Sequence, residues 1–352
     1  MTRESGVRIG VVGLGKMGLM HASIFNGLSG SRVVAVAEPT AVMRRAFKEM
    51  QSPVSFYDNV EGMLQQEERL DAVVITTPVA THVPVSISCV KHGVPFFVEK
   101  PLAVSANQAA DLGRALRESP TPHMVGFMTR FVEAFRKGKD LIASGCLGRL
   151  QRVLATIYVS QLFTQGQGWR YDRKVSGGGV LLSQGSHLMD LLAWYFGPVA
   201  RVNADMLSIY SSGIEDFAHV MLEFQGGLRA WVDCSWSVRF HRTVEITIDV
   251  LGDNGALVVQ DDNVRIHLDR SAGGAPAGGS SWNSVDLFRG VELDIGEPQY
   301  SREDEAFLQG LRLSAMPEPG FRQAYHIQQI VDAAYASSQR KGEPISIPKG
   351  DF

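Results

Sequence analysis

The sequence predicts an α/β domain followed by an α+β domain, and three observations lead to this fold class. Apolar, strand-like runs alternate with helical patterns over residues 7–127. Beyond residue 128, longer alternating runs follow one another with few helices between them. The chain has 352 residues, more than one hydrophobic core commonly organises. We therefore predict two domains, residues 1–127 and residues 128–352.

The first domain is expected to hold a parallel sheet. Its strand patterns fall at Val7–Val12, Arg32–Ala37, Ala72–Thr76, Pro95–Val98 and His123–Phe127. Helical patterns lie between them, at Lys16–Leu28, Ala41–Met50, Asn59–Gln66, Thr81–His92 and Ser105–Glu118. Strands that alternate with helices in this way form βαβ units, whose strands are parallel. Ser105 is a favourable N-cap for the last of these helices.

The second domain is expected to hold an open, mostly antiparallel sheet. A helix over Phe131–Ser144 precedes strand patterns at Leu150–Leu162, Ala200–Tyr210, Phe217–Phe224, Leu228–Trp236, Val244–Leu251, Ala256–Gln260 and Val264–Leu268. Gly226-Gly227 and Asp253-Asn254-Gly255 provide turns between neighbouring strands. The Gly-, Ala- and Ser-rich stretch 272–281 is expected to be a mobile loop. Helical patterns at Arg302–Leu313 and Phe321–Lys341 follow.

Composition and cysteine spacing narrow the class of protein. A net charge of −3 gives no general attraction to nucleic acid or to an anionic membrane, so neither is expected as a partner. No apolar run approaches the ~18 residues of a membrane span, and Met1–Gly6 is too short and polar for a signal peptide. Cys89, Cys146 and Cys234 lack metal-ligand spacing, so we expect reduced thiols, no metal site and a cytoplasmic protein.

A glycine-rich segment, Gly13-x-Gly15-x-x-Gly18, follows the first predicted strand and opens a helix. Gly13 permits a tight turn, Gly15 lets the backbone approach a pyrophosphate, and Gly18 lets the helix pack close to the sheet. The amides at the start of the helix, including those of Lys16 and Met17, favour phosphate groups. In this context the segment predicts a Rossmann-type dinucleotide site.

Glu38 ends the second predicted strand, 20 residues beyond Gly18, where a carboxylate accepts hydrogen bonds from adenosine ribose hydroxyls. Its charge repels a 2′-phosphate, which favours NAD over NADP. Arg44 and Arg45 in the following helix argue the other way, because an arginine there can receive that phosphate. We give them less weight than Glu38.

Lys100 follows an apolar strand and precedes Pro101. This position is the carboxyl end of a parallel strand, where open α/β sheets bind their ligands. The proline restricts Lys100 to extended geometry and permits a cis peptide bond. The alternative is an ordinary surface lysine. We predict that Lys100 polarises a substrate oxygen beside a nicotinamide.

His187 lies three residues before Asp190 at the start of an apolar helical pattern, so the two share a helix face. The preceding Gly177–Gly179 run and Ser183 are expected where a backbone approaches a substrate closely. Asp190 is expected either to orient the imidazole or to complement the helix dipole. Trp169 and Arg170 precede the glycine run and are predicted to line the substrate pocket. The alternative for His187 is a structural helix histidine.

Taken together, these motifs resemble the Gfo/Idh/MocA oxidoreductases, the glucose–fructose oxidoreductase and inositol dehydrogenase group. The resemblance covers essentially the whole chain. It rests on Gly13–Gly18, Thr77-Pro78 through His82, Glu99-Lys100-Pro101-Leu102, Val125-Gly126-Phe127 with Arg130-Phe131, Gly177-Gly178-Gly179 through His187, and a helix that begins near Phe321.

The resemblance implies a Rossmann domain, a domain with an open antiparallel sheet, and C-terminal helices that return toward the nucleotide domain. It implies hydride transfer between a nicotinamide and a secondary ring hydroxyl or ketone of a sugar, glycoside or cyclitol. It implies a homodimer or homotetramer that associates through the sheets. The resemblance also implies residue roles. The residues expected to bind the cofactor are Thr77, Pro78, His82 and Glu99. Arg130 is expected to bind the substrate, and Lys100 and His187 are expected to be catalytic.

One departure from the family pattern concerns Ser183, where many members carry an aspartate. Serine hydrogen-bonds a hydroxyl but cannot hold a negative charge beside an imidazole. Either Lys100 and His187 share the proton transfer, or Asp190 substitutes, or activity is weaker. Two alternative functions follow from the same motifs: a redox-assisted glycoside-cleaving enzyme, and a non-catalytic dinucleotide-sensing regulatory protein. An NADP-dependent biliverdin-type reductase is disfavoured by Glu38 and by the segment around His187.

Overall fold

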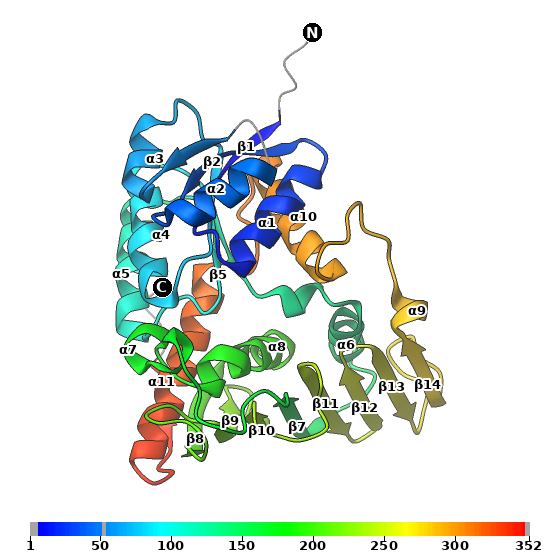
Figure 1. Ribbon diagram of the computed structural model, residues 1–352. Helices are drawn as coiled ribbons and strands as arrows, with labels where there is room; N and C mark the ends of the chain where they lie inside the picture. Colours follow the sequence, from blue (N-terminus) through cyan, green and yellow to red (C-terminus); the bar gives the residue numbers. More distant parts are fainter. Residues whose placement is uncertain (1–5, 51–53, 349–352) are drawn as a thin grey trace. The chain divides into compact units, whose positions relative to one another are not determined.

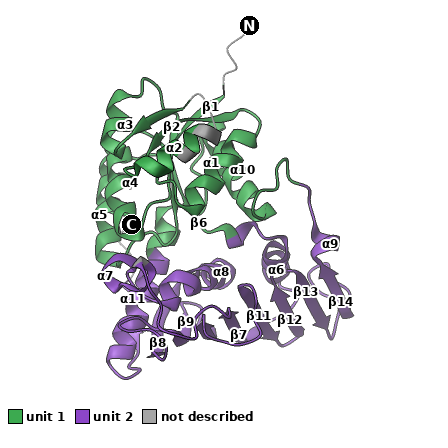
Figure 2. Ribbon diagram, in the orientation of Figure 1, with its two compact units in different colours: residues 1–128, 291–325 green, residues 129–290, 326–352 purple. Residues whose placement is uncertain are grey.

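The computed structural model describes residues 6–50 and 54–348 and divides into two compact units (Figure 2). Unit 1 comprises Met1–Met128 and Val291–Tyr325, and unit 2 comprises Thr129–Gly290 and His326–Phe352. A stretch from late in the sequence therefore folds with the N-terminal residues. Among the described residues, no helix combines the length and apolarity that a membrane crossing needs.

Unit 1 contains a six-stranded sheet in which every paired strand is parallel (Figure 1). Its strands are β1 (Val7–Val12), β2 (Ser31–Ala37), β3 (Ser55–Tyr57), β4 (Ala72–Ile75), β5 (Phe96–Glu99) and β6 (His123–Gly126). The order β3-β2-β1-β4-β5-β6 is that of a Rossmann sheet and confirms the predicted fold class. The sequence did not indicate β3, because its three residues are exposed or half-buried and carry no apolar run.

The helices of unit 1 lie close to the predicted positions. They are α1 (Lys16–Gly27), α2 (Ala41–Met50), α3 (Val60–Gln66), α4 (His82–Lys91), α5 (Ala106–Glu118) and α10 (Pro298–Arg312), with the short 3-10 turn η1 (Val79–Thr81) before α4. The Ser105 side chain caps α5 as predicted, accepting the Gln108 N–H. Helix α10 packs against α1 through Phe307, whose ring contacts Phe25 and Phe97.

Unit 2 contains a nine-stranded sheet, with the order β14-β13-β12-β11-β7-β10-β9-β8-β15. Its strands are β7 (Leu150–Tyr158), β8 (Val199–Leu207), β9 (Phe217–Phe224), β10 (Arg229–Ser235), β11 (Glu245–Gly252), β12 (Gly255–Gln260), β13 (Asn263–Leu268), β14 (Gly278–Asn283) and β15 (Ile345–Ser346). The pairs are antiparallel except for the parallel pair β7–β10. This arrangement confirms the predicted open, mostly antiparallel sheet.

Helices cover one face of this sheet. Helix α6 (Glu133–Ala143) contacts β12 and β13, and α8 (Ser186–Phe196) contacts β7 (Figure 1). Apart from a π-helical turn before α8, the remaining described elements are the short helices α7 (Arg173–Ser176) and α9 (Ser284–Leu287), the 3-10 turns η2 (Met128–Phe131) and η3 (Trp169–Tyr171), and helix α11 (Phe321–Gln339).

The expectation of a mobile loop over residues 272–281 is wrong for its second half. Residues 278–283 form β14, which pairs with β13 along its whole length. The backbone N–H and C=O groups at the edge of β13 bind a strand of almost any composition, since the ladder uses main-chain atoms. A Gly- and Ser-rich sequence therefore does not exclude a strand there.

Candidate functional site

The glycine-rich segment forms a tight turn between β1 and α1. Gly13 has φ +92°, a conformation that favours glycine. A Cβ at Gly18 would lie 2.0 Å from the Gly13 carbonyl oxygen, so a larger residue is excluded there. A Cβ at Gly15 would meet nothing within 4 Å, which shows open space beside the turn. This geometry fits the turn of a dinucleotide loop; that the three glycines contact the cofactor stays a prediction.

The start of α1 fits an anionic group. Gly15 is its N-cap, and no side chain among the described residues caps the helix. Lys16 is exposed and Met17 half-buried in the first turn. Uncapped amides at a helix N-terminus bind phosphate, and the helix dipole favours negative charge. The residues present therefore fit the pyrophosphate of a dinucleotide.

Glu38 directly follows β2, and its side chain contacts the glycine turn at Leu14. Its carboxylate oxygens accept the N–H groups of Leu14 (2.8 Å) and Thr40 (2.9 Å). Burial opposes ionisation, but these N–H groups and the Arg44 guanidinium together lower the pKa of Glu38. Glu38 is therefore a carboxylate at neutral pH, with lone pairs left for ribose hydroxyls.

Arg44, one of the two arginines that argued for NADP, is already bound by other groups. Its guanidinium donates to the Glu38 carbonyl oxygen at 2.7 Å and pairs with the Asp58 carboxylate. A 2′-phosphate would have to compete with Asp58 for this cation. Arg45 is exposed. The arrangement agrees with the preference for NAD.

The segments that follow β4 and β5 are joined by His82. Its two ring nitrogens lie 2.7 Å from the Thr77 carbonyl oxygen and 2.8 Å from the Pro101 carbonyl oxygen. The ring is buried, and burial lowers the pKa of His82. Thr77 also accepts the Thr81 hydroxyl at 2.8 Å, and Pro78 is the N-cap of η1. These contacts show that His82 fixes both segments through main-chain atoms; that it contacts the cofactor stays a prediction.

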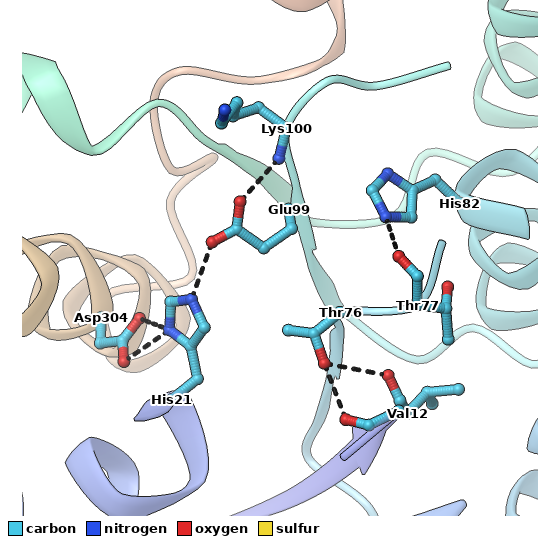
Figure 3. A network of polar contacts seen from close by, with 9 residues as sticks. Val12, His21, Thr76, Thr77, His82, Glu99, Lys100 and Asp304 are labelled. Carbon is cyan, nitrogen blue, oxygen red and sulfur yellow. Dashed lines mark hydrogen bonds and ion pairs between the residues drawn. The ribbon is translucent and has the colours of Figure 1, made fainter. Parts of the chain in front are cut away.

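Lys100 directly follows β5 and is half-buried. The Lys100–Pro101 peptide bond is cis, as the sequence allowed. The Lys100 N–H donates to the neighbouring Glu99 carboxylate at 3.0 Å. The other Glu99 oxygen lies 3.0 Å from His21 Nε2, and His21 Nδ1 contacts Asp304 (Figure 3). Sequence reasoning missed His21 and Asp304, which are separated by 283 positions and carry no local motif.

In unit 2, His187 is buried in the first turn of α8. The preceding turn, Leu181–Gly185, is a π-helix and carries Ser183, which is half-buried. Single π-helical turns are frequent at functional sites because they change the direction of neighbouring side chains. Ser183 and His187 lie four residues apart, so they share a face of this helical stretch.

Asp190 forms an ion pair that neither of its two predicted roles anticipated. It is fully buried, and both of its oxygens accept N–H groups of Arg130, each at 2.7 Å. The reason is that Arg130 is itself buried in the same unit and needs an anionic partner. Arg130, predicted to bind the substrate, therefore has a structural partner; contact with a substrate stays a prediction.

The interpretation of the glycine run also requires correction. A Cβ at Gly178 would lie 1.9 Å from the Tyr335 hydroxyl, and one at Gly179 would lie 2.1 Å from the Glu215 carbonyl oxygen. The close approach is thus to this protein's own residues. Buried Glu215 accepts N–H groups of Gly179 (3.1 Å) and Leu181 (3.0 Å) and the Tyr335 hydroxyl (2.9 Å). Sequence reasoning missed Glu215, which fixes the start of the π-helical turn.

The remaining predicted substrate residues lie in η3. Arg170 is exposed, and the side chain of Trp169 lies outside the described part of the structure. Their contact with a substrate stays a prediction.

The three cysteines are buried and free, and the described residues contain no group of three or more His, Cys, Asp or Glu side chains that could hold a metal ion.

A Rossmann sheet, an uncapped glycine turn and an acidic residue at the end of β2 define a dinucleotide-binding protein. Two family models match the chain: the oxidoreductase family with an NAD-binding Rossmann fold over residues 7–127, and the GFO/IDH/MocA C-terminal domain over residues 135–258. The chain belongs to the Gfo/Idh/MocA family of NAD-binding oxidoreductases.

Named relatives agree with this family. The chain is 26% identical to scyllo-inositol 2-dehydrogenase (NAD⁺) of Bacillus subtilis, over 73% of this chain and 74% of the relative. It is 27% identical to myo-inositol 2-dehydrogenase of Thermotoga maritima, over 74% and 76%. It is 28% identical to the rhizopine catabolism protein MocA of Rhizobium meliloti, over 54% and 57%.

Solved structures show the same fold. A levoglucosan dehydrogenase in complex with NADH superposes with a TM-score of 0.87 at 19% identity, covering 98% of this chain and 100% of that one. An oxidoreductase from Agrobacterium radiobacter, in complex with NAD⁺, L-tartaric acid and magnesium, gives 0.83 at 17% identity, covering 97% and 98%. At these low sequence identities, the structural similarity shows a shared fold and no more.

Proposed function

We propose that this protein is an NAD-dependent dehydrogenase that transfers a hydride between the nicotinamide and a secondary ring hydroxyl, or ketone, of a sugar, glycoside or cyclitol. The observation that carries the proposal is the position of Lys100. It lies at the carboxyl end of β5, in the same unit as the glycine turn, with its N–H bound by Glu99. The inositol dehydrogenases among the relatives support the substrate class.

NAD, when bound, supplies the hydride acceptor. Side chains of this protein then bind the substrate oxygen and transfer the hydroxyl proton. We assign to Lys100 a hydrogen bond to the reacting oxygen, and to His187 the acceptance of the hydroxyl proton during oxidation. We assign substrate hydroxyl binding to Ser183, and further contacts to Arg170 and Trp169. Because Ser183 carries no charge, the catalytic set has one carboxylate fewer than in many family members.

The test is a screen of oxidised NAD against sugars, cyclitols, glycosides and nucleotide sugars, followed by the absorbance of NADH. We expect turnover with at least one polyol. Release of a glycoside's leaving group without net NADH would identify redox-assisted cleavage instead. Tight NAD binding without turnover on any member of the panel would contradict the proposal and favour the regulatory alternative.

We further propose a homo-oligomer that associates through the face of the unit 2 sheet opposite helices α6 and α8. Trp231 on β10 is 47% exposed and lies opposite Leu154 on β7, which is 38% exposed. On its other side Trp231 lies opposite Met221 on β9. Exposed apolar side chains on adjacent strands form a patch that a second copy can bury.

Light scattering tests this association. Trp231→Glu should dissociate the oligomer, whereas Phe240→Glu, which changes a 98% exposed aromatic residue outside the sheet, should leave it intact. A wild-type monomer would contradict this proposal. Cytoplasmic localisation stays a prediction; the free, buried cysteines are compatible with it.

A further inference from the structure

A buried chain of charged groups links α1, β5 and α10 within unit 1. His21 on α1 lies between two carboxylates, as Figure 3 shows. Its Nε2 is 3.0 Å from Glu99 Oε1, and its Nδ1 is 2.8 Å and 3.0 Å from the two oxygens of Asp304. His21 and Asp304 are fully buried, and Glu99 is 7% exposed. Water therefore has little access to these contacts.

Both ring nitrogens of His21 face carboxylate oxygens, an arrangement in which an imidazolium donates on each side. A neutral imidazole would direct one lone pair at a carboxylate oxygen, whereas an imidazolium donates to both sides. Burial alone would lower the pKa of His21, but Asp304 and Glu99 together raise it well above its ordinary value. The other rings beside His21 are Phe97, at 5.1 Å between centroids, and Tyr300, at 6.4 Å. Neither brings a second cation.

The imidazolium connects two parts of the dinucleotide unit. His21 stands one turn beyond Gly18, on the helix that begins at the glycine turn. Glu99 uses one oxygen for His21 and the other for the Lys100 N–H, at 3.0 Å. A displacement of His21 would release this carboxylate and, with it, the backbone of Lys100.

We propose that His21 is a positioning residue for Lys100: held by Asp304, it fixes the Glu99 carboxylate, which in turn fixes the backbone at Lys100 relative to the dinucleotide-binding helix. The catalytic part of this inference rests on the proposed function. His21 itself is not assigned a contact with substrate or cofactor.

The variant His21→Gln removes the charge and one of the two donors. Asp304→Asn is the milder change, since its amide oxygen still accepts the Nδ1–H of His21. It replaces His21→Gln in the measurements if that variant folds poorly. His92→Gln is the matched control, because His92 is an exposed histidine of the same unit whose ring lies against the Ser88 carbonyl oxygen, away from the chain of charged groups.

Amide hydrogen exchange tests the structural link without any substrate. In His21→Gln, a peptide covering residues 99–102 should exchange at least about 10-fold faster, whereas a peptide covering β4 changes much less. Asp304→Asn should show a smaller increase, and His92→Gln none. Unchanged exchange at residues 99–102 in a folded variant would overturn the inference. A uniform increase over both peptides would overturn it too, because that result indicates general destabilisation.

Kinetics test the catalytic link. We expect kcat of His21→Gln to fall by roughly 10- to 100-fold, as for misplacement of a catalytic group, with little change in NADH affinity. Faster exchange with unchanged kcat would overturn the inference and leave the proposed function intact. If the wild-type protein turns over no polyol, the proposed function fails, and the exchange measurement still decides whether His21 positions the Lys100 backbone.

Discussion

The guanidinium of Arg130 donates two parallel hydrogen bonds to the carboxylate of Asp190, with both N–O distances at 2.7 Å. Asp190 is fully buried and Arg130 is 7% exposed. Arg130 also lies over the Trp194 ring, 5.5 Å from its centroid. The pair joins η2 to α8, the helix that carries His187, so it supports the position of that histidine through the backbone of unit 2.

We predict that Asp190→Asn or Arg130→Met alone destabilises the protein by about 3–5 kcal/mol, because each leaves a buried charge without its partner. The double variant Arg130→Met with Asp190→Leu should lose much less than the sum of the single changes. Urea denaturation of the four proteins measures this coupling. Additive losses would mean that the pair is not an energetic unit.

The Arg130–Asp190 ion pair bears on the effect that a carboxylate at position 183 should have on the pH–rate profile. Asp190 is bound to Arg130, and Ser183→Asp would place a further carboxylate on the face of the helical stretch that carries His187. The imidazolium would gain a partner, and the pKa of His187 would rise. We expect the acidic limb of the pH–rate profile to move to higher pH, with Ser183→Asn as the uncharged control. A profile that does not move would show that His187 does not titrate in this limb.

Lys100→Met and His187→Ala should each lower kcat by roughly two to four decades, the range for lost acid–base catalysis. Folding and NAD binding should remain largely intact, since the Glu99 contact to position 100 uses the backbone N–H. Steady-state kinetics and NADH titration separate the two effects. Near-normal turnover of His187→Ala would return that histidine to a structural role.

Cofactor preference should depend on the charge of Glu38. Glu38→Gln keeps one acceptor oxygen for the N–H groups of Leu14 and Thr40 and removes the charge that repels a 2′-phosphate. We expect the ratio of NADP to NAD dissociation constants to fall by about 10- to 100-fold. Arg45→Gln is the control and should leave the ratio unchanged. Wild-type binding of NADP that equals or exceeds that of NAD would mean that Arg44 or Arg45 dominates.

Stability should depend on pH through Asp261. Burial and the nearby Asp262 and Glu245 carboxylates raise its pKa from 3.8 to about 6, while its side chain accepts the Ile246 N–H. The folded state therefore holds this proton more tightly than the unfolded chain, so stability falls as pH rises from about 4 to 6. Asp261→Asn should be more stable than wild type by about 2–3 kcal/mol at pH 7.5, with little difference near pH 3.5.

Urea midpoints at the two pH values check this last expectation, with Asp294→Asn, a change at an exposed aspartate elsewhere in the chain, as the control. Equal midpoints of Asp261→Asn and wild type at pH 7.5 would show that the Asp261 carboxyl group ionises in the folded state at little cost.

Features with a local cause were predictable from the sequence. The period of apolar residues indicated the strands and helices of both units, the Gly13–Gly18 spacing indicated the dinucleotide turn, and Pro101 indicated the geometry at Lys100. Residues within one turn of helix or one strand generate these signals, and here local preference and tertiary structure agree. Where the local signal was weak, as in β3 and β14, main-chain pairing with a neighbouring strand decided the structure.

By itself, the sequence determined the two kinds of sheet, the dinucleotide turn and the family. Only the tertiary structure decided which charged side chains meet. It paired Asp190 with Arg130, 60 positions away, placed His21 between Glu99 and Asp304, and brought Glu215 against Gly179. A buried charge requires a partner, but many arginines, histidines and carboxylates along the chain satisfy that requirement equally well. The packing of distant segments selects one of them, and no local pattern encodes that choice.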